Sequence, residues 1–290
     1  MPRTVDSREG RNHKRVAVYP QMLRKALQAG KKEKMAETKT ETKKTKKSEV
    51  KKLKAKKSEI TLKALLEAGC HFGHQARRWN PKMKPYLYDV RQGVHIFDLV
   101  KTKEGLEAAC EFAKKAATQG KQIVFLGTKR QARAIIEEVA KKIGVPYVNE
   151  RWIGGTITNW EQVRKNLDKL KEMKKAKEEG EYKKYTKKEQ ILLDKEISRL
   201  ERFYGGLVGL EKIPEVIFVV DVKKEDTAVR EAKKKGVVII GLVDSDSDPD
   251  WADWVIPGND DAVGSIKFIV EKIGEAVKEG KEIANKISNV

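Results

Sequence analysis

The chain has 290 residues and a formal net charge of +20, and its composition argues against a membrane-spanning or a disulfide-rich secreted protein. No apolar run approaches the roughly 20 residues of a membrane span, and the two cysteines, Cys70 and Cys110, form no paired motif. We therefore expect a soluble, cytosolic protein. Residues 1–57 contribute +14 of the charge and the rest of the chain only +6, so the rest must bind any nucleic acid through local patches.

Residues 1–57 form a basic extension that we expect to be disordered. Residues 31–57 hold 13 lysines against 4 glutamates and show no hydrophobic period. Such a segment cannot bury enough apolar surface to offset the entropy lost on ordering. Two interpretations stay open, a solvated tail and an arm that binds RNA non-specifically. The start of the mature chain is also open, because Met35 begins the part rich in lysine, threonine and glutamate.

The stretch 70–101 combines cations with aromatic rings on a backbone interrupted by prolines and glycines. A short helix from Thr61 to Gly69 should precede it, and it should contain strands at 86–90 and 94–97 joined by a turn. Cations bind phosphates, and flat rings stack on bases or pack beneath the loop. The pattern predicts a nucleic-acid contact. Its candidate residues are Arg77, Arg78, Trp79, Lys82, Lys84 and Arg91.

A parallel α/β arrangement is predicted for most of the remaining chain. Thr102 is expected to begin an amphipathic helix that Gly120 ends. Short apolar runs then alternate with amphipathic helices, and because these runs are continuous, both faces of the sheet should be covered. We expect a mostly parallel sheet between two helical layers, with a strand order that the sequence does not specify. Strands are expected at 122–126, 146–148, 216–220, 237–243 and 254–256, and helices at 131–143, 227–235 and 260–278.

The alternation stops between Trp160 and Tyr204. Apolar residues there recur at spacings of three and four, and charged residues fill most other positions. Thr186 and Glu189 form a capping-box pattern that restarts a helix after the turn near Gly180. The segment predicts an antiparallel coiled-coil hairpin that contacts RNA or a neighbouring protein. The expected domains are an α/β/α domain of residues 58–159 and 205–290, with the hairpin of residues 160–204 inserted in it.

Ligands of parallel α/β sheets gather at the carboxyl ends of the strands. The sequence Gly127–Arg130 lies at such an end, where a helix N-terminus and two cations could bind phosphate. The loops GxGxxG and GxxxxGK[ST] are both absent, which makes a free dinucleotide-binding module the weakest hypothesis. A phosphate contact in RNA is favoured instead. Its candidate residues are Lys129, Arg130, Arg133 and Arg151.

Two residue groups raise the question of metal binding. The aspartates of Asp244–Asp250, with Asp221, could hold Mg²⁺, so a Mg²⁺-dependent enzyme acting on a phosphorylated substrate is the alternative function. The same residues are common in turns and helix caps. Cys70, His71 and His74 match zinc ligands in type and spacing, but no fourth ligand is evident. We expect no metal, no cofactor and no catalytic residue.

Several long sequence blocks, in this order, resemble the bacterial small-subunit ribosomal protein S-two family over about residues 60–283. The resemblance implies a flavodoxin-like α/β/α fold, no enzymatic activity, and a place on the cytoplasmic ribosome near the head–body junction of the small subunit. It also implies contacts with small-subunit ribosomal RNA and with other small-subunit proteins, including the S-one protein where the organism has one. Neither a membrane contact nor a homo-oligomer is expected. The blocks are HFGHQARRWNPKMKPY (71–86), VHIFDLVKT (94–102), GTKR (127–130), RWIGGTITNW (151–160), YTKKE (185–189), IPEVIFVVD (213–221), VDSDSDPD (243–250) and VIPGNDDA (255–262).

The region 211–265 carries a net charge of −6, in contrast to the rest of the chain. Because acidic surface repels RNA, we expect this region to face protein.

Overall fold

A five-stranded parallel sheet forms the centre of the computed structural model, which describes residues 60–288. With the strands numbered along the sheet's own chain order, their arrangement is 2-1-3-4-5, the order of flavodoxin-like sheets. The predicted fold class is confirmed, and the strand order is new. The predicted disorder of residues 1–57 and the proposed start at Met35 lie outside the described residues. From edge to edge the strands are β5 (Tyr147–Val148), β4 (Ile123–Leu126), β6 (Val216–Val220), β7 (Val238–Val243) and β8 (Trp254–Pro257).

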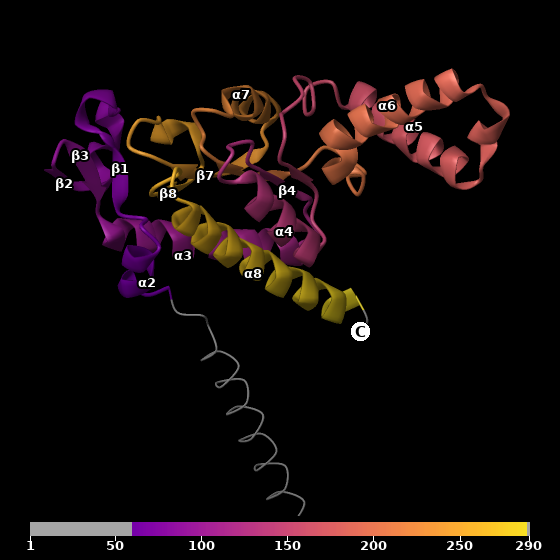
Figure 1. The fold of residues 1–290 in the computed structure, drawn as a ribbon. Helices are drawn as coiled ribbons and strands as arrows, with labels where there is room; N and C mark the ends of the chain where they lie inside the picture. The colour runs from indigo at the N-terminus through magenta and orange to yellow at the C-terminus, as the bar shows by residue number, and fades with distance from the viewer. Residues whose placement is uncertain (1–59, 289–290) are drawn as a thin grey trace, which may run out of the picture. The chain divides into compact units, whose positions relative to one another are not determined.

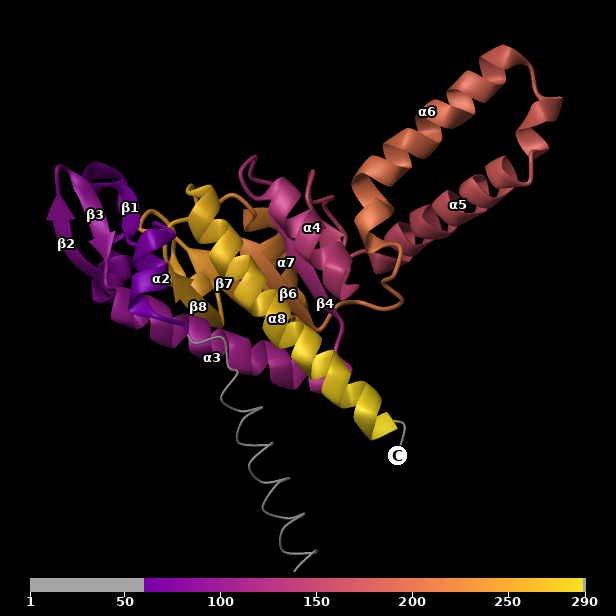
Figure 2. The ribbon, with the colours of Figure 1, turned by 60° about the horizontal axis from the view of Figure 1, so that its bottom comes forward.

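Helices cover both faces of this sheet (Figures 1 and 2). One face packs against α3 (Leu99–Thr118), α4 (Arg133–Ile143) and α8 (Val263–Ser288), and α3 and α8 lie side by side. The other face packs against α7 (Asp226–Lys235). Successive residues of each strand point to opposite faces, so every residue of β6 is buried, in one hydrophobic core or the other.

A second, antiparallel sheet precedes the main one. Its order is β1 (Phe72–Gln75), β3 (Val94–Phe97), β2 (Leu87–Arg91). The predicted strands β2 and β3 are confirmed, and they are joined through Gln92 and Gly93, whose positive φ angles of 51° and 76° suit a tight hairpin. The sequence analysis missed β1, because four residues with an irregular pairing show no alternation.

The segment between β1 and β2 is folded as two 3₁₀ helices, η1 (Ala76–Arg78) and η2 (Pro81–Tyr86). Upstream, the predicted short helix is present as α2 (Leu62–Glu67), and the Thr61 hydroxyl accepts a hydrogen bond from the Ala64 N–H as its cap.

Two predicted helix starts are wrong. The cap of α3 is Asp98, whose carboxylate accepts a hydrogen bond from the Val100 N–H at 2.9 Å, and Thr102 is buried inside the helix. Aspartate and threonine both cap helices, so the local sequence did not exclude Thr102 as the cap. The final helix begins at Val263 rather than at 260, because the Asn259 side chain accepts from two backbone N–H groups and forms a turn there.

The predicted helices of the hairpin are α5 (Trp160–Glu178) and α6 (Lys187–Tyr204), joined through η3 (Glu181–Lys184). They lie side by side in opposite directions (Figure 1), and Thr186 and Glu189 form the predicted capping box. Cross-helix ion pairs join them, and the apolar residues at their base merge with the core of the second sheet face. That the hairpin is a separate domain stays a prediction.

Two 3₁₀ turns complete the chain, η4 (Gly205–Leu207) and η5 (Pro249–Trp251). None of the helices in residues 60–288 has an apolar run long enough to cross a lipid bilayer.

Candidate functional site

Charged side chains meet at the carboxyl ends of the main-sheet strands. The Lys129 Nζ, just after β4, lies 2.7 Å from Asp260 Oδ1, 2.6 Å from Asp261 Oδ1 and 3.3 Å from Asp221 Oδ2. Asp221 follows β6 with a positive φ of 67°, which an aspartate tolerates better than most residues. Ligands of this fold class bind where the strand order reverses, here between β4 and β6. In this protein its own Lys129 and Asp221 meet at that point.

Burial and charge both act on Lys129 and Asp260. Burial alone would lower the pKa of Lys129, but the neighbouring carboxylates outweigh it and raise that pKa above its ordinary value. Burial, with repulsion from Asp244 and Asp221, raises the pKa of Asp260 to about 8, although Lys129 opposes the rise. The Lys129 side chain is only 13% exposed, so this cation is directed inward.

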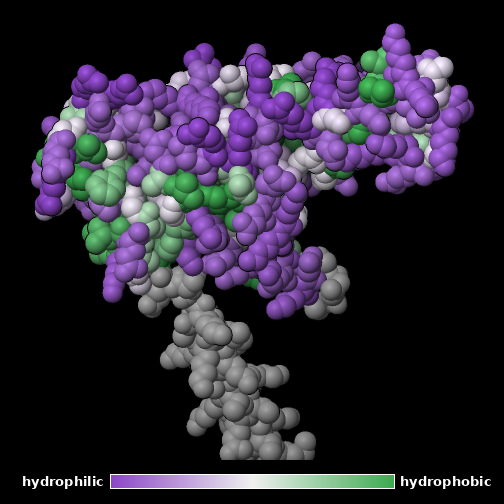
Figure 3. Space-filling model, in the orientation of Figure 1, coloured by the Kyte–Doolittle hydropathy of each residue, from purple (hydrophilic) through white to green (hydrophobic). Residues whose placement is uncertain are grey.

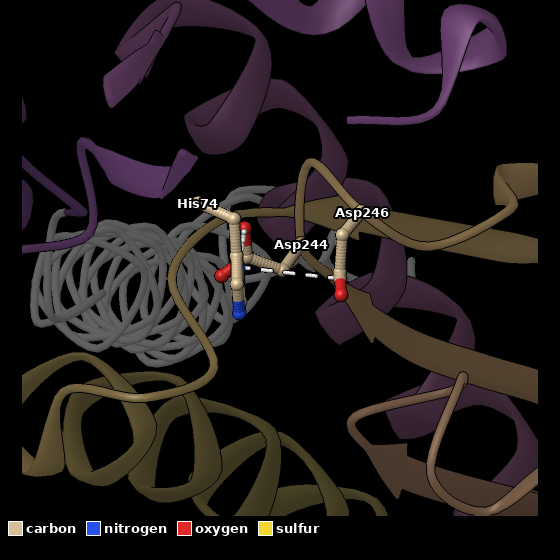
Figure 4. Close-up of side chains that lie close together, drawn as sticks. All are labelled: His74, Asp244 and Asp246. Carbon is tan, nitrogen blue, oxygen red and sulfur yellow. Dashed lines mark ion pairs between the residues drawn. The ribbon is translucent and has the colours of Figure 1, made fainter. Parts of the chain in front are cut away.

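His74 of β1 joins the same cluster from the small sheet. Its Nδ1 lies 2.9 Å from Asp244 Oδ1 and 4.0 Å from Asp246 Oδ1 (Figure 4). Its Nε2 lies 3.3 Å from Asp261 Oδ2. The hydrogen bond to Asp244 raises the pKa of His74 to about 9, against the opposing effect of burial. A protonated His74 therefore links the two sheets electrostatically. We call the whole set the acidic network: His74, Lys129, Asp221, Asp244, Asp246, Asp260 and Asp261.

Some of these residues have the donor atoms of a metal site. His74 with Asp244 and Asp246, or with Asp260 and Asp261, places its ligand atoms within 4.8 Å of one another. Imidazole nitrogen and carboxylate oxygen suit Zn²⁺ and similar divalent ions. A metal would require His74 to release its proton, and the same carboxylates already pair with His74 or Lys129.

Cys70, His71 and His74, which match zinc ligands in type and spacing, do not come together as one site. Among the residues that the structure describes, the groups with metal-ligand spacing contain His74 but neither Cys70 nor His71. Cys70 is fully buried, and burial raises the pKa of its thiol. It therefore behaves as a core residue.

The four aspartates of Asp244–Asp250 do not all converge on one point, because only Asp244 and Asp246 approach each other beside His74. Lys82 Nζ lies 2.8 Å from Asp248 Oδ2 and 2.6 Å from Asp250 Oδ2, whereas Asp244 faces His74. The Mg²⁺ enzyme hypothesis needed these carboxylates around a single ion, and the geometry does not provide that.

Several carboxylates of the region 211–265 are internal. Glu225, Glu231, Asp244 and Asp260 are buried, so the net charge of −6 does not describe an acidic surface. The net charge of this region therefore gives less reason to expect that it faces protein.

The predicted RNA-binding cations divide into two groups. Within residues 60–288, four of them are exposed and have no ion pair or hydrogen bond through their side chains, and two more are held only loosely. Arg77 bonds the Gln75 side chain at 3.2 Å, and Arg91 lies 3.8 Å from Asp89. The face seen in Figure 3 is largely hydrophilic over the small sheet and along α5 and α6. The four unpaired cations are Arg78, Lys84, Arg130 and Arg151.

The other three predicted cations are engaged by carboxylates. Lys129 belongs to the acidic network, and Lys82 pairs with two aspartates. Arg133 donates to the Thr128 carbonyl at 3.0 Å and pairs with Glu150 at 3.2 Å. The remaining candidate, Trp79, is half-buried, with its ring centroid 5.0 Å from that of His95.

Sequence reasoning missed Glu231, a buried residue of α7. Its carboxylate accepts hydrogen bonds from the N–H groups of Gly155, Ile157 and Thr158 at 2.7–3.2 Å, and from the Trp152 indole. These donors lower its pKa although burial alone would raise it. Glu231 thereby fixes the loop that leads into the hairpin. The only signal was the Gly154–Gly155 pair, which suggested a close backbone approach without naming a partner.

The chain is similar to known proteins over most of its length. A family model described as "Ribosomal protein S2" matches residues 65–280. Three relatives carry the name "Small ribosomal subunit protein uS2". The relative from Coprothermobacter proteolyticus is 49% identical over 223 residues, 77% of this chain and 83% of the relative. The relative from Dictyoglomus thermophilum is 48% identical over 227 residues, 78% and 92%. The relative from Rippkaea orientalis is 46% identical over 222 residues, 77% and 83%.

Proposed function

This chain belongs to the ribosomal protein S2 family, and from that premise we propose that it binds small-subunit ribosomal RNA through exposed, unpaired cations. It is a structural constituent of the small ribosomal subunit, and it is not an enzyme. The observation that carries the proposal is the division of the cations into paired and unpaired sets. The binding residues are Arg77, Arg78, Lys84, Arg91, Arg130 and Arg151.

Unpaired cations suit this role for an electrostatic reason. Each cation that neutralises a phosphate releases a counterion from the RNA, which favours binding and makes it dependent on salt. A lysine already neutralised by carboxylates gains less from a phosphate and must first lose its own partners. Lys129 and Arg133 therefore serve mainly to hold the fold, and Lys82 contributes less than Arg78.

The pairing of the inward-facing cations also explains why an α/β protein of this kind need not be an enzyme. In this fold class the sheet edge between β4 and β6 commonly accepts a ligand. Here Lys129, Asp221 and His74 bring their charges together at that edge and link it to the small sheet. The fold is used as a rigid support for the exposed cations.

Neighbouring small-subunit proteins are the second class of partner. We propose that the exposed edge strand β2, where Tyr88 is 73% exposed, contacts a protein near the head–body junction. The family resemblance makes the S-one protein the first candidate where the organism has one. The test is retention of S-one on particles that carry Tyr88→Ala, which should fall. Phe72→Ala, an exposed aromatic residue on the opposite edge strand β1, is the control and should retain S-one.

The RNA proposal is tested by the salt dependence of binding. Full-length protein is titrated with small-subunit ribosomal RNA at several salt concentrations, with excess unrelated duplex RNA present to compete for non-specific binding. Each of Arg78→Ala, Lys84→Ala and Arg151→Ala should reduce the slope of log affinity against log salt by about one unit. Lys115→Ala, an exposed lysine on α3 outside the proposed set, is the control and should leave the slope unchanged. Wild-type slopes in all three variants would overturn the proposal.

A further inference from the structure

A buried imidazole nitrogen without a partner lies beneath the cationic segment, by which we mean residues 76–91. His95 of β3 is only 7% exposed, and within residues 60–288 its Nε2 forms no hydrogen bond. The side chain lies on the same face of the small sheet (β1, β3 and β2) as the buried Phe97, since the two residues are two positions apart on one strand. Against it lies Trp79, whose ring centroid is 5.0 Å away at an interplanar angle of 37°.

The arrangement leaves His95 Nε2 without a hydrogen-bond partner among the protein groups that the structure describes. Each ring nitrogen of histidine is a hydrogen-bond donor or acceptor, and an unsatisfied buried polar atom costs about 1–3 kcal/mol. A phenylalanine would fill much the same space beside Trp79 without that cost. Buried polar groups without a partner are few in folded proteins, and each one calls for an explanation, such as a functional role or a bound water or ion.

The surroundings of this nitrogen indicate which partner fits. Arg77 and Arg78 directly precede Trp79 and Lys84 follows it in η2, so exposed cations come both before and after Trp79 along the chain. The adjoining strand β2 contributes the carboxylate of Asp89, which accepts a hydrogen bond from the Val90 N–H and lies 3.8 Å from Arg91. Cations for phosphates, a flat ring for a base and a nitrogen for one hydrogen bond are the elements that recognise an unpaired nucleotide.

We propose that Trp79 and His95 form a nucleotide-binding site within the ribosomal RNA interface. An unstacked base of the RNA stacks on the Trp79 indole, and His95 Nε2 forms a hydrogen bond with the base edge or the ribose hydroxyl of that nucleotide. The site rests on the proposed RNA-binding function. The exposed cations contact phosphates, and this site adds a contact with the base or ribose of one nucleotide.

The site opens by a movement of one side chain. His95 Nε2 is buried in the free protein, so the Trp79 indole must turn outward before a nucleotide reaches it. The backbone on either side is held, because the Ala76 N–H donates to the Gly93 carbonyl and the Asn80 N–H donates to the Ser245 carbonyl, both at 2.8 Å. Rotamer changes of this kind are common when an interface forms.

The decisive variant is His95→Phe, because the site predicts effects of opposite sign on folding and on binding. Removal of the unsatisfied nitrogen should leave the thermal midpoint unchanged or raise it. Affinity for small-subunit ribosomal RNA should nevertheless fall about fivefold to tenfold, the value of one lost hydrogen bond. The salt slope should stay at the wild-type value, since no phosphate contact is lost.

His95→Gln is the matched control, because its amide nitrogen can occupy nearly the position of Nε2, and it should bind within about twofold of wild type. Wild-type RNA affinity in His95→Phe would overturn the site. This result is distinct from failure of the proposed function, which would appear as unchanged salt slopes in Arg78→Ala and its companions.

A second readout does not depend on the stability of the His95 variants. Stacking of a base on Trp79 should quench part of the tryptophan fluorescence when the RNA is added. Trp79→Phe should abolish that part of the change while Trp254→Phe, a half-buried tryptophan packed on Phe112, should retain it. Identical quenching in wild type and Trp79→Phe would also overturn the site.

Discussion

The cationic segment and the acidic network both contain basic side chains, which are exposed in the first and enclosed by carboxylates in the second. Arg78 is exposed and has no charged partner within residues 60–288, whereas Lys129 is 13% exposed and lies within 3.3 Å of three carboxylates. Both positions follow similar local patterns of glycine, aromatic and basic residues in the sequence. The comparison shows that a cation's role depends on which carboxylates the fold brings to it. Substitutions at the two regions should therefore separate effects on folding from effects on RNA binding.

The largest expected effect is the loss of stability in Lys129→Ala. Removal of this lysine leaves Asp221 and Asp260 close together without a compensating cation, so the free energy of unfolding should fall by about 3 kcal/mol. Urea denaturation at pH 7, followed by circular dichroism, measures it. Lys115→Ala should change the value by less than about 0.5 kcal/mol. A loss in Lys129→Ala no larger than in this control would mean that the acidic network contributes little to the fold.

The stability of the wild-type protein should fall as the pH rises from about 6.5 to 9. The folded-state pKa of His74, about 9, and of Asp260, about 8, both lie above their ordinary values of 6.5 and 3.8. The folded protein thus binds more protons than the unfolded chain, and the stabilisation is lost as the pH passes through the folded-state pKa values. One pKa unit corresponds to about 1.4 kcal/mol, so the decrease should exceed about 2 kcal/mol.

This pH dependence is measured by urea denaturation at pH 6.5, 8 and 9, with a chelator present so that no divalent ion competes for the network. His74→Gln should flatten the profile, because it removes one of the two titrating groups. A stability that rises across this range would contradict the assignment of His74 as a protonated link.

A smaller effect is expected from freeing Lys82 of its two aspartates. In the double variant Asp248→Asn with Asp250→Asn, the Lys82 ammonium loses both charged partners and becomes available to phosphate. The salt slope of RNA binding should become steeper by up to about one unit. The thermal midpoint should move by no more than about 2 °C, because the pairs are exposed. The same double change combined with Lys82→Ala should restore the wild-type slope. A steeper slope that persists without Lys82 would show that repulsion by the aspartates, and not the freed lysine, was responsible.

The smallest expected effect on folding is that of Arg78→Ala. This exposed side chain has no partner to lose within residues 60–288, so the free energy of unfolding should stay within about 0.5 kcal/mol of wild type. The measurement is the same urea titration, and it matters because the variant should lose RNA affinity at unchanged stability. A substantial loss of stability would place Arg78 among the structural cations with Lys129.

Much of the fold could be predicted from local pattern. The continuous apolar runs at 216–220 and 237–243 indicated buried strands, and the capping box of Thr186 and Glu189 marked the start of α6. The strand order and the presence of β1 could not be predicted in this way, because they depend on pairing between distant segments. The start of α3 was misplaced for a local reason, since Asp98 and Thr102 are both residue types that cap helices.

The site was less predictable, because ion pairs join residues far apart in the chain. Lys82 meets Asp248 across 166 positions, and His74 lies opposite Asp244 at a similar separation. The sequence identified the charged residues of both regions but not their partners. It also gave no sign that Glu231 would receive the N–H groups of the loop before α5.

A map of RNA crosslinks on the protein, made on intact small subunits by ultraviolet irradiation and mass spectrometry, shows directly which cations face RNA. We expect crosslinks concentrated in residues 76–91, with Trp79 among them, and further crosslinks at Arg130 and Arg151. We expect none at Lys129 or at the aspartates of the acidic network. Crosslinks concentrated in residues 244–261, with none in residues 76–91, would contradict this expectation.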